Sequence, residues 1–405
     1  MPQNNMRLSV HHVGGRSGSR GFPDLLCFEG DLINVIYEAD DDCVEQIFER
    51  NRGRDSELHV LDSCLADKVQ STTFNINYDP YTSSLLETNE DYGSFYSYSG
   101  GGDGKYDYIQ SETNKTVEKR PVVTTTLDEI FTTNPMDLQL PDFLSLDTQG
   151  TEYEILQGGR STVSPGLLAL VAEVGFHPTY KGQRLFGDLC ELLSDMGFHF
   201  VKFIALMEAS PFRGPLGLRA QGFQLQGEAL FLKRIESIPH DVPLDAIVML
   251  KKLAFISIVF SQFEYGLQCL ERANQMIVEY GLDDSGSGCT YLNFLKGLEV
   301  EVAKTPEIYP QTFASRYTQE SSSARFNVSA DSPAGRKLKA RITRRLGAIT
   351  NRFRWSKFLK RWLIDGLQSK RRTGDQNSGV EAFLIQFGLE NQAQDLRKSR
   401  LSQST

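Results

Sequence analysis

One stretch decides the fold, and it reads Phe143-Leu144-Ser145-Leu146-Asp147-Thr148-Gln149-Gly150-Thr151-Glu152-Tyr153-Glu154-Ile155-Leu156-Gln157-Gly158. A short apolar run leads into an Asp and a Gln-Gly turn, and a segment with helical spacing follows. This order predicts a strand, a turn and an amphipathic helix that begins at Glu152. Asp147 then lies at the carboxyl end of a strand, which is the edge where open α/β sheets bind ligands.

Short β-rich runs recur on both sides of this stretch and alternate with amphipathic segments, which predicts an α/β fold with a largely parallel sheet. The predicted strands are Leu8–Val13, Leu32–Tyr37, Leu58–Leu61, Pro141–Leu146, Leu167–Val174, Phe198–Ile204 and Ala229–Lys233. Helical spacing marks Asp42–Asn51 and Gln183–Met196. We therefore expect a seven-stranded, mostly parallel, doubly wound sheet.

The chain has 405 residues, more than one core usually holds, so we expect more than one region. Residues 1–236 form the predicted α/β domain, and residues 237–318 form a helical region that includes long helices over Pro243–Tyr280. A polar linker over 319–335 and a basic helical region over 336–405 follow. The Gly-, Ser- and Tyr-rich stretch Asn89–Lys105 has the composition of a flexible loop.

A glycine-rich turn follows the first predicted strand, with glycines at positions 14, 15, 18 and 21. Such a turn lets the backbone approach a nucleotide closely, although the Gly-x-Gly-x-x-Gly register of dinucleotide enzymes is absent. The second strand ends in Glu38, about twenty residues further on, where an acid accepts hydrogen bonds from ribose hydroxyls. The alternatives are a plain strand-to-helix turn and an acid at the N-cap or in the first turn of a helix, which Asp40 to Asp42 fit better than Glu38.

At the quoted stretch the sequence resembles the FkbM-type methyltransferases, whose hallmark Ser145 to Gly158 follow almost throughout. Further agreements occur in the family's order: Tyr37–Asp40, Ser83–Leu85, Thr126–Asp128, Glu173–Gln183, Gly197–Phe198 and Ala229–Leu232. The resemblance covers roughly residues 8 to 235. It departs at the first glycine turn, where similar members have an acid before the first glycine and Asn two after it. Here these places hold His12 and Arg16.

This resemblance implies a class I, Rossmann-like methyltransferase that uses S-adenosylmethionine to methylate a hydroxyl of a saccharide or a related metabolite. The expected cofactor-binding residues are Gly14, Gly15, Gly18, Glu38, Asp147 and Gln149. The expected substrate-binding residues are Ser83, Ser84, Tyr180 and Gln183.

Methyl transfer to oxygen needs collinear reactants and benefits from a base or a metal near the acceptor hydroxyl. The catalytic candidates at the sheet edge are Asp147, Glu173 and His177. His177 suits a base because an unperturbed imidazole has a pKa near 6.5, although a structural histidine before Pro178 is an equal alternative. Asp147 and Glu173 also suit a divalent cation such as magnesium, but they can instead bind the cofactor's amino group or tie loops together.

The six cysteines lie at positions 27, 43, 64, 190, 269 and 289, without Cys-x-x-Cys pairs or His at metal-ligand spacing. This pattern argues against a zinc site or a disulfide framework. No signal peptide is recognisable, and the longest apolar run, Leu253–Phe260, is too short to span a bilayer. We expect a cytoplasmic protein.

The net charge of −9 is unevenly distributed, since Arg336 to Arg372 contains fourteen Lys or Arg residues and one acid, Asp365. Apolar residues at helical spacing from Leu338 to Phe353 predict a basic amphipathic helix. Such a helix can make peripheral contact with an anionic membrane, bind an acidic partner or pack on the acidic front domain. Nucleic acid fits its chemistry but is not the expected partner.

Two rival functions remain open. In one, the altered first turn no longer binds cofactor, and the chain is a catalytically inactive relative whose helical half recruits a partner. In the other, the chain is a nicotinamide-dependent oxidoreductase, which the missing third glycine of the dinucleotide register disfavours.

Overall fold

A computed structural model describes residues 6–14, 16, 20–40, 43–51, 56–98, 107–133, 136–211, 222–282 and 288–304. The elements described below belong to one compact unit, apart from the last residues of α9, from Val300 onward. The predicted linker and basic helical region, residues 319–405, lie outside the described residues, as do Gly15 and Gly18.

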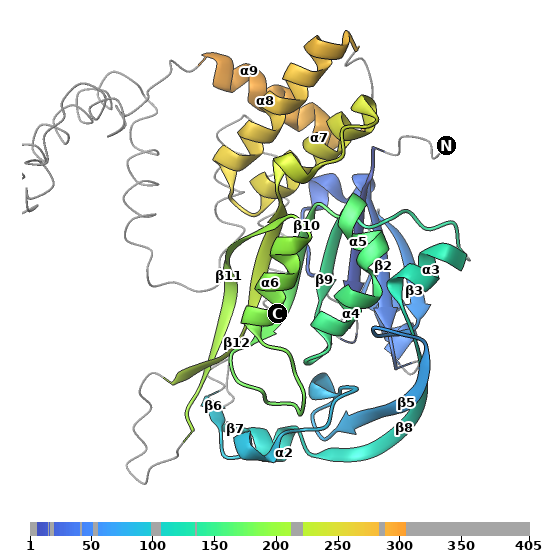
Figure 1. The fold of residues 1–405 in the computed structure, drawn as a ribbon, viewed down its shortest axis with the longest axis vertical. Helices are drawn as coiled ribbons and strands as arrows, with labels where there is room; N and C mark the ends of the chain where they lie inside the picture. The colour runs from blue at the N-terminus through green and yellow to red at the C-terminus, as the bar shows by residue number, and fades with distance from the viewer. Residues whose placement is uncertain are drawn as a thin grey trace, which may run out of the picture. The chain divides into compact units, whose positions relative to one another are not determined.

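A seven-stranded sheet forms the centre of the fold (Figure 1). Its order is β11-β12-β10-β9-β1-β2-β3, in which β12 runs antiparallel to both β10 and β11 and the other neighbours are parallel. The strands are β1 (Leu8–Val13), β2 (Leu32–Glu38), β3 (Glu57–Asp62), β9 (Phe143–Leu146), β10 (Ala169–Gly175), β11 (Phe198–Ala209) and β12 (Phe223–Lys233). All seven predicted strands are present, and the predicted Rossmann-like fold class is confirmed.

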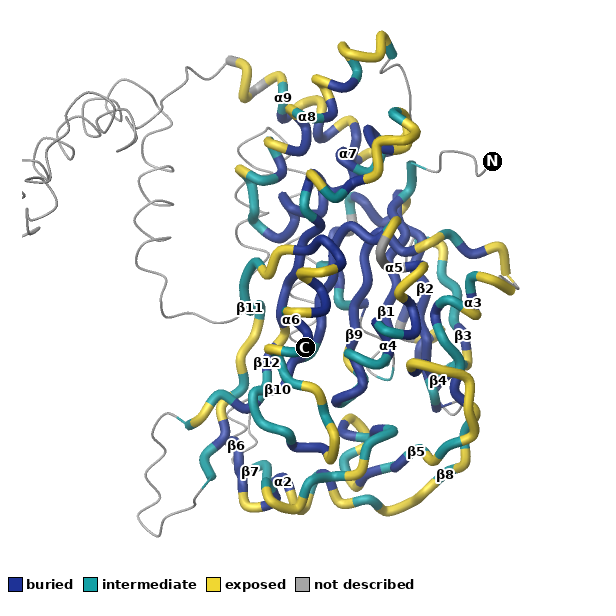
Figure 2. The backbone as a smooth tube through the Cα atoms, in the orientation of Figure 1, coloured by how far each residue is buried: buried dark blue, intermediate teal, exposed yellow. Residues whose placement is uncertain are grey.

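Helices cover both faces of this sheet, and for that reason β1, β2 and β9 are buried along their whole length (Figure 2). One face packs α3 (Leu127–Thr133), α4 (Glu152–Gly158) and α6 (Phe186–Asp195). The other face packs α7 (Pro243–Val259), α8 (Phe263–Tyr280) and α9 (Thr290–Lys304). The remaining helices are α1 (Val44–Arg50), α5 (Arg160–Gly166) and the 3-10 turns η2 (Leu26–Asp31) and η6 (Ile235–Ser237).

An insertion between β3 and β9 was not predicted from the sequence. It contains a three-stranded sheet in the order β4-β8-β5 and a two-stranded sheet. Its elements are β4 (Cys64–Leu65), β5 (Gln70–Asn77), η4 (Pro80–Thr82), η5 (Glu90–Tyr92), β6 (Tyr96–Tyr98), β7 (Asp107–Ile109), α2 (Gln110–Thr113) and β8 (Thr116–Thr125). Because β5 and β8 are exposed on much of both faces, they lack the apolar alternation that reveals a strand.

The predicted flexible loop over Asn89–Lys105 has regular structure in its first ten residues, where Glu90–Tyr92 form η5 and Tyr96–Tyr98 form β6. Phe95 and Tyr96 are buried there, and Tyr96 exchanges two backbone hydrogen bonds with Ser210. Glycine and serine content suggested mobility, but the aromatic residues anchor this segment. Residues 99–106 lie outside the described part.

The helices α7 to α9 share a hydrophobic core with the sheet and are joined to it by buried polar contacts. Lys252 Nζ lies 2.7 Å from Asp142 Oδ2, and the same oxygen accepts the Ser9 N–H at 2.8 Å. Asp31 Oδ2 accepts the N–H of Tyr291, near the start of α9, at 2.8 Å. A buried charge is tolerated when it is paired. Lys252, which directly precedes the apolar run Leu253–Phe260, therefore fixes α7 to the sheet through Asp142.

We expect Lys252→Met to lower the free energy of unfolding by about 3 to 5 kcal/mol, because it leaves the Asp142 carboxylate buried without a cation. Burial already raises the pKa of Asp142, and Lys252 opposes that shift. Acidification protonates Asp142, so the loss should shrink as the pH falls. Urea denaturation at several pH values measures this.

The matched control is Lys119→Met, which removes an exposed ion pair with Glu87 and should cost about 1 kcal/mol or less. Equal losses for the two variants would show that Asp142–Lys252 does not anchor α7.

Candidate functional site

A cavity lies at the carboxyl edge of the central strands and encloses about 700 Å³, part of it open to solvent. Strand ends and the loops after them supply Val13, Gly14, Arg16, Tyr37, Glu38, Ala39, Ser63, Asp147, Thr148, Gln149 and Thr151. The insertion supplies Cys64, Leu65, Phe74, Pro80, Tyr81, Ser83 and Leu85. Four predicted cofactor residues (Gly14, Glu38, Asp147 and Gln149) and Ser83 thus lie on one cavity.

Gly14 brings the ends of β1 and β9 together. Its φ is +94°, and a Cβ added there would lie 1.8 Å from the backbone oxygen of Asp147. Its N–H donates to the Tyr37 carbonyl at 3.1 Å, and the Asp147 N–H donates to the Val13 carbonyl at 3.0 Å. No side chain fits between these backbones, so the position requires glycine.

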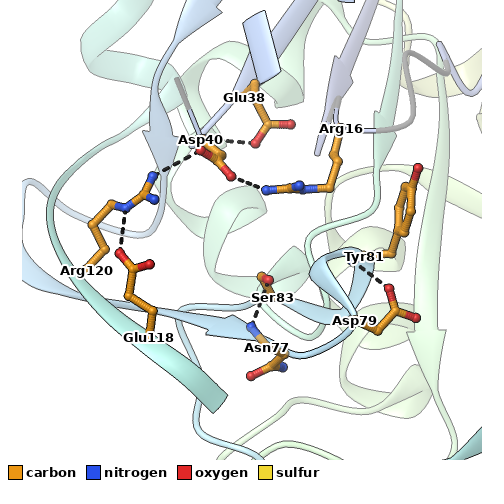
Figure 3. Close-up of polar contacts among 9 residues, drawn as sticks. All are labelled: Arg16, Glu38, Asp40, Asn77, Asp79, Tyr81, Ser83, Glu118 and Arg120. Carbon is orange, nitrogen blue, oxygen red and sulfur yellow. Dashed lines mark hydrogen bonds and ion pairs between the residues drawn. The ribbon is translucent and has the colours of Figure 1, made fainter. Parts of the chain in front are cut away.

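Glu38 presents an unused hydrogen-bond acceptor at the cavity. Its Oε1 accepts the Asp40 N–H at 2.9 Å, whereas Oε2 is buried without a hydrogen-bond partner among the described residues (Figure 3). Burial raises the pKa of this carboxyl, although the Asp40 N–H and the Arg16 charge oppose the shift. A buried acceptor without a partner costs free energy, and a ligand hydroxyl in the cavity would remove that cost.

Asp40 ties the glycine turn to the insertion. Arg16, from the turn, and Arg120, from β8, each donate to one of its oxygens, and the Arg120 contact measures 3.0 Å (Figure 3). Arg120 also contacts Glu118 at 3.3 Å. Arg16, one of the two departures from the family pattern, is therefore held beside the cavity by an ion pair. The other departure, His12, is buried with neither ring nitrogen hydrogen-bonded within the described part of the chain, and its burial lowers its pKa.

This ion-pair chain is not predicted from the sequence. There Asp40 fits an acid at the start of a helix, and Arg120 lies in a strand without recognisable alternation.

The predicted pair Asp147 and Glu173 is joined by Gln149, and of the two acids Asp147 lines the cavity whereas Glu173 does not. The amide nitrogen of Gln149 donates to Asp147 Oδ1 at 3.0 Å and to Glu173 Oε2 at 2.8 Å. Burial, followed by the charges of Asp147 and Glu152, raises the pKa of Glu173 well above the ordinary range. The structure thus places both carboxylates at one amide, with Asp147 lining the cavity.

Glu152 shapes the turn beneath these residues. Its carboxylate accepts the N–H groups of Thr148 at 2.9 Å and of Gly150 at 3.1 and 3.2 Å. Burial raises its pKa to about 7. This side chain therefore holds the Gln-Gly turn in the shape that presents Asp147 and Gln149 to the cavity.

Three predicted substrate-binding residues, Ser84, Tyr180 and Gln183, contact the Gln-Gly turn and do not line the cavity. The Ser84 hydroxyl donates to the Gln149 carbonyl at 2.8 Å. The Tyr180 hydroxyl donates to the Thr82 carbonyl at 2.8 Å and lies 3.1 Å from Gln149 Oε1. Gln183 accepts the Tyr180 N–H at 3.3 Å and packs over the faces of Gly150 and Gly175.

His177 lies away from the cavity lining, among aromatic rings. Its ring centroid is 5.7 Å from those of Tyr92 and Phe95 and 6.1 Å from that of Phe223. Such packing positions the imidazole within a wall formed by the insertion and β12. Among the described residues, no side-chain hydrogen bond supports its predicted role as a base.

Within the described ranges, no group of three or more His, Cys, Asp or Glu side chains is arranged to hold a metal ion. In the same ranges, no helix has the length and apolarity needed to cross a bilayer.

The α/β part of the chain is similar to a known family of proteins. The family model described as "Methyltransferase FkbM domain" matches residues 20–200. No curated protein matches the chain. A solved structure of methyltransferase FkbM from Methylobacillus flagellatus KT is 13% identical and has a TM-score of 0.29 over 56% of this chain. The match spans 44% of that relative's length, and the overall likeness is too weak to add to the family match.

Residues 20–200 supply every described cavity-lining residue except Val13, Gly14 and Arg16. The resemblance to the FkbM methyltransferase family is thereby confirmed for the α/β part of the chain.

Proposed function

We propose that the chain is an S-adenosylmethionine-dependent O-methyltransferase that acts on a hydroxyl of a saccharide or a related metabolite. The observation that carries the proposal is that Glu38, which lines the same cavity as Asp147, has an Oε2 without a hydrogen-bond partner among the described residues. The family match makes methyl transfer the expected chemistry. The acceptor class and a cytoplasmic location rest on the sequence interpretation.

The residues present fit this cofactor. Glu38 offers a carboxylate oxygen to ribose hydroxyls, and Gly14 allows the backbone to come close to the ligand. Leu65, Phe74 and Tyr81 give the insertion side of the cavity the apolar and aromatic surface that a nucleobase packs on. When bound, S-adenosylmethionine supplies a methyl group on a positively charged sulfur, and the carboxylate of Asp147 complements that charge.

Asp147 is also the best-placed acceptor for the proton that an attacking hydroxyl must lose. It lies on the cavity, whereas Glu173 is bonded through Oε2 to Gln149 and through Oε1 to Gln226. A base must reach the proton that it abstracts. Methyl transfer then requires the acceptor oxygen to be held in line with the methyl carbon, and Gln149 and Ser83 offer polar groups on the lining for that task.

Titration calorimetry with S-adenosylhomocysteine tests the cofactor site. We expect the parent protein to bind and Glu38→Ala to bind about 10- to 100-fold more weakly, because hydrogen bonds to a charged group are lost. Glu45→Ala, on the exposed surface of α1, is the control and should bind as the parent does. Absence of binding by the parent would refute the proposal and would favour the inactive relative, whose altered first turn no longer binds cofactor.

Gly14→Ala tests the close approach of the two strand ends. The added methyl group meets the Asp147 carbonyl and must displace the turn, so S-adenosylhomocysteine affinity should fall by more than about tenfold. In Gly30→Ala the new methyl group meets open space, so that variant should keep both affinity and stability. Circular dichroism and urea denaturation establish that each variant is folded. Unchanged affinity in folded Gly14→Ala would show that this turn does not shape the cavity.

A further inference from the structure

The amide of Gln149 is fixed more rigidly than an ordinary surface glutamine. Its backbone has a φ of +58°, which non-glycine residues adopt only at a cost. The hydroxyl of Ser84 binds its carbonyl, and the hydroxyl of Tyr180 lies 3.1 Å from its side-chain oxygen. With the oxygen occupied, the amide nitrogen must face Asp147 and Glu173.

Glu173 is surrounded by acids. Across the antiparallel pair β10–β12 it lies directly opposite Glu228, and side chains paired in this way share one face of the sheet. Asp147 lies at the far end of the same Gln149 amide, and Glu152 lies beneath the turn. The tyrosines Tyr108 and Tyr180 also face this carboxyl. Ionising Glu173 would add a charge to a group that already holds three acids, and like charges directly opposite in a sheet are destabilising.

The side-chain amide of Gln226 is the partner of the other Glu173 oxygen. Its nitrogen donates to Glu173 Oε1 at 2.5 Å. The two ends of an amide interchange by a half-turn, so a protonated Glu173 can donate to the Gln226 oxygen. Its other oxygen then accepts from Gln149.

We propose that Glu173 is a neutral carboxylic acid that positions the Gln149 amide, and that Gln149 in turn orients the ionised carboxylate of Asp147 at the cavity. Glu173 is then neither the base nor a cation ligand, since its two oxygens are hydrogen-bonded to Gln149 and Gln226. The pKa of Glu173, raised by burial and by the surrounding charges, agrees with this assignment. Orienting Asp147 for catalysis rests on the proposed function, but the protonation state of Glu173 does not.

The pH dependence of stability tests this without any ligand. Glutamate in an unfolded chain has a pKa of about 4.3. If the pKa of Glu173 is higher in the folded protein, the stability that its neutral form contributes is lost as the pH rises above about 4.3. Glu173→Gln is an isostere of the neutral acid and does not suffer this loss. We expect the difference in melting temperature between Glu173→Gln and the parent to increase in favour of the variant by about 2 °C or more from about pH 5 to about pH 8.

Glu152→Gln is the matched contrast within the same cluster. The carboxylate of Glu152 accepts backbone N–H groups, so an amide there places donor against donor and should lower the melting temperature across the same pH range. Glu173→Ala should also be destabilised, because it leaves both amides without their partner. If Glu173→Gln loses stability as Glu152→Gln does, or does not fold, Glu173 is an ionised acceptor and the proposal is wrong.

Infrared spectroscopy of the ligand-free protein supplies a readout that packing alone would not change. A neutral Glu173 should give a protonated-carboxyl carbonyl band near neutral pH that is absent from Glu173→Gln. In Gln149→Leu the band should move to higher frequency, because the carbonyl loses the Gln149 donor. Absence of this band from the parent would overturn the assignment. These results do not depend on S-adenosylhomocysteine binding, so they can stand even if the proposed function fails.

Discussion

The close approach of two backbones, at Gly14 and Asp147, is the constraint on which the site depends. The carbonyl of Asp147 occupies the space of any side chain at position 14, and two backbone hydrogen bonds, from Gly14 to Tyr37 and from Asp147 to Val13, align the ends of β1, β2 and β9. Because parallel strands end at the same edge, this alignment brings Glu38 and Asp147 to one cavity although more than a hundred residues separate them. The rest of the site is arranged around these two acids.

The two acids have different surroundings, and these suit different tasks. Among the described residues Glu38 has one oxygen without a hydrogen-bond partner, and the Arg16–Asp40–Arg120 ion pairs hold the neighbouring backbone. Asp147 lies in a denser acidic group, where Gln149 joins it to Glu173. An open acceptor suits hydroxyl recognition, whereas an oriented carboxylate suits a positive charge or a proton. This division follows from local contacts and does not require the His12 and Arg16 positions to match other family members.

The central sheet could be predicted because strands such as β2, β9 and β10 are mostly apolar and end in recognisable turns. The stretch from Phe143 to Gly158 alone placed a strand, the Gln-Gly turn and the start of α4. The insertion escaped prediction because β5 and β8 carry polar residues on both faces. That omission hid Arg120 and the apolar wall around Phe74 and Tyr81. Similarly, no sequence pattern reveals that Ser84 and Tyr180 reach the Gln149 turn from behind, since that contact depends on how the insertion folds back.

The most direct test of the account is a crystal structure of the full chain with S-adenosylhomocysteine. The account predicts ribose hydroxyls within hydrogen-bond distance of Glu38 Oε2, the nucleobase against Phe74 and Tyr81, and the sulfur on the Asp147 side of the cavity. A ligand bound elsewhere, with Glu38 Oε2 still lacking a partner, would contradict it.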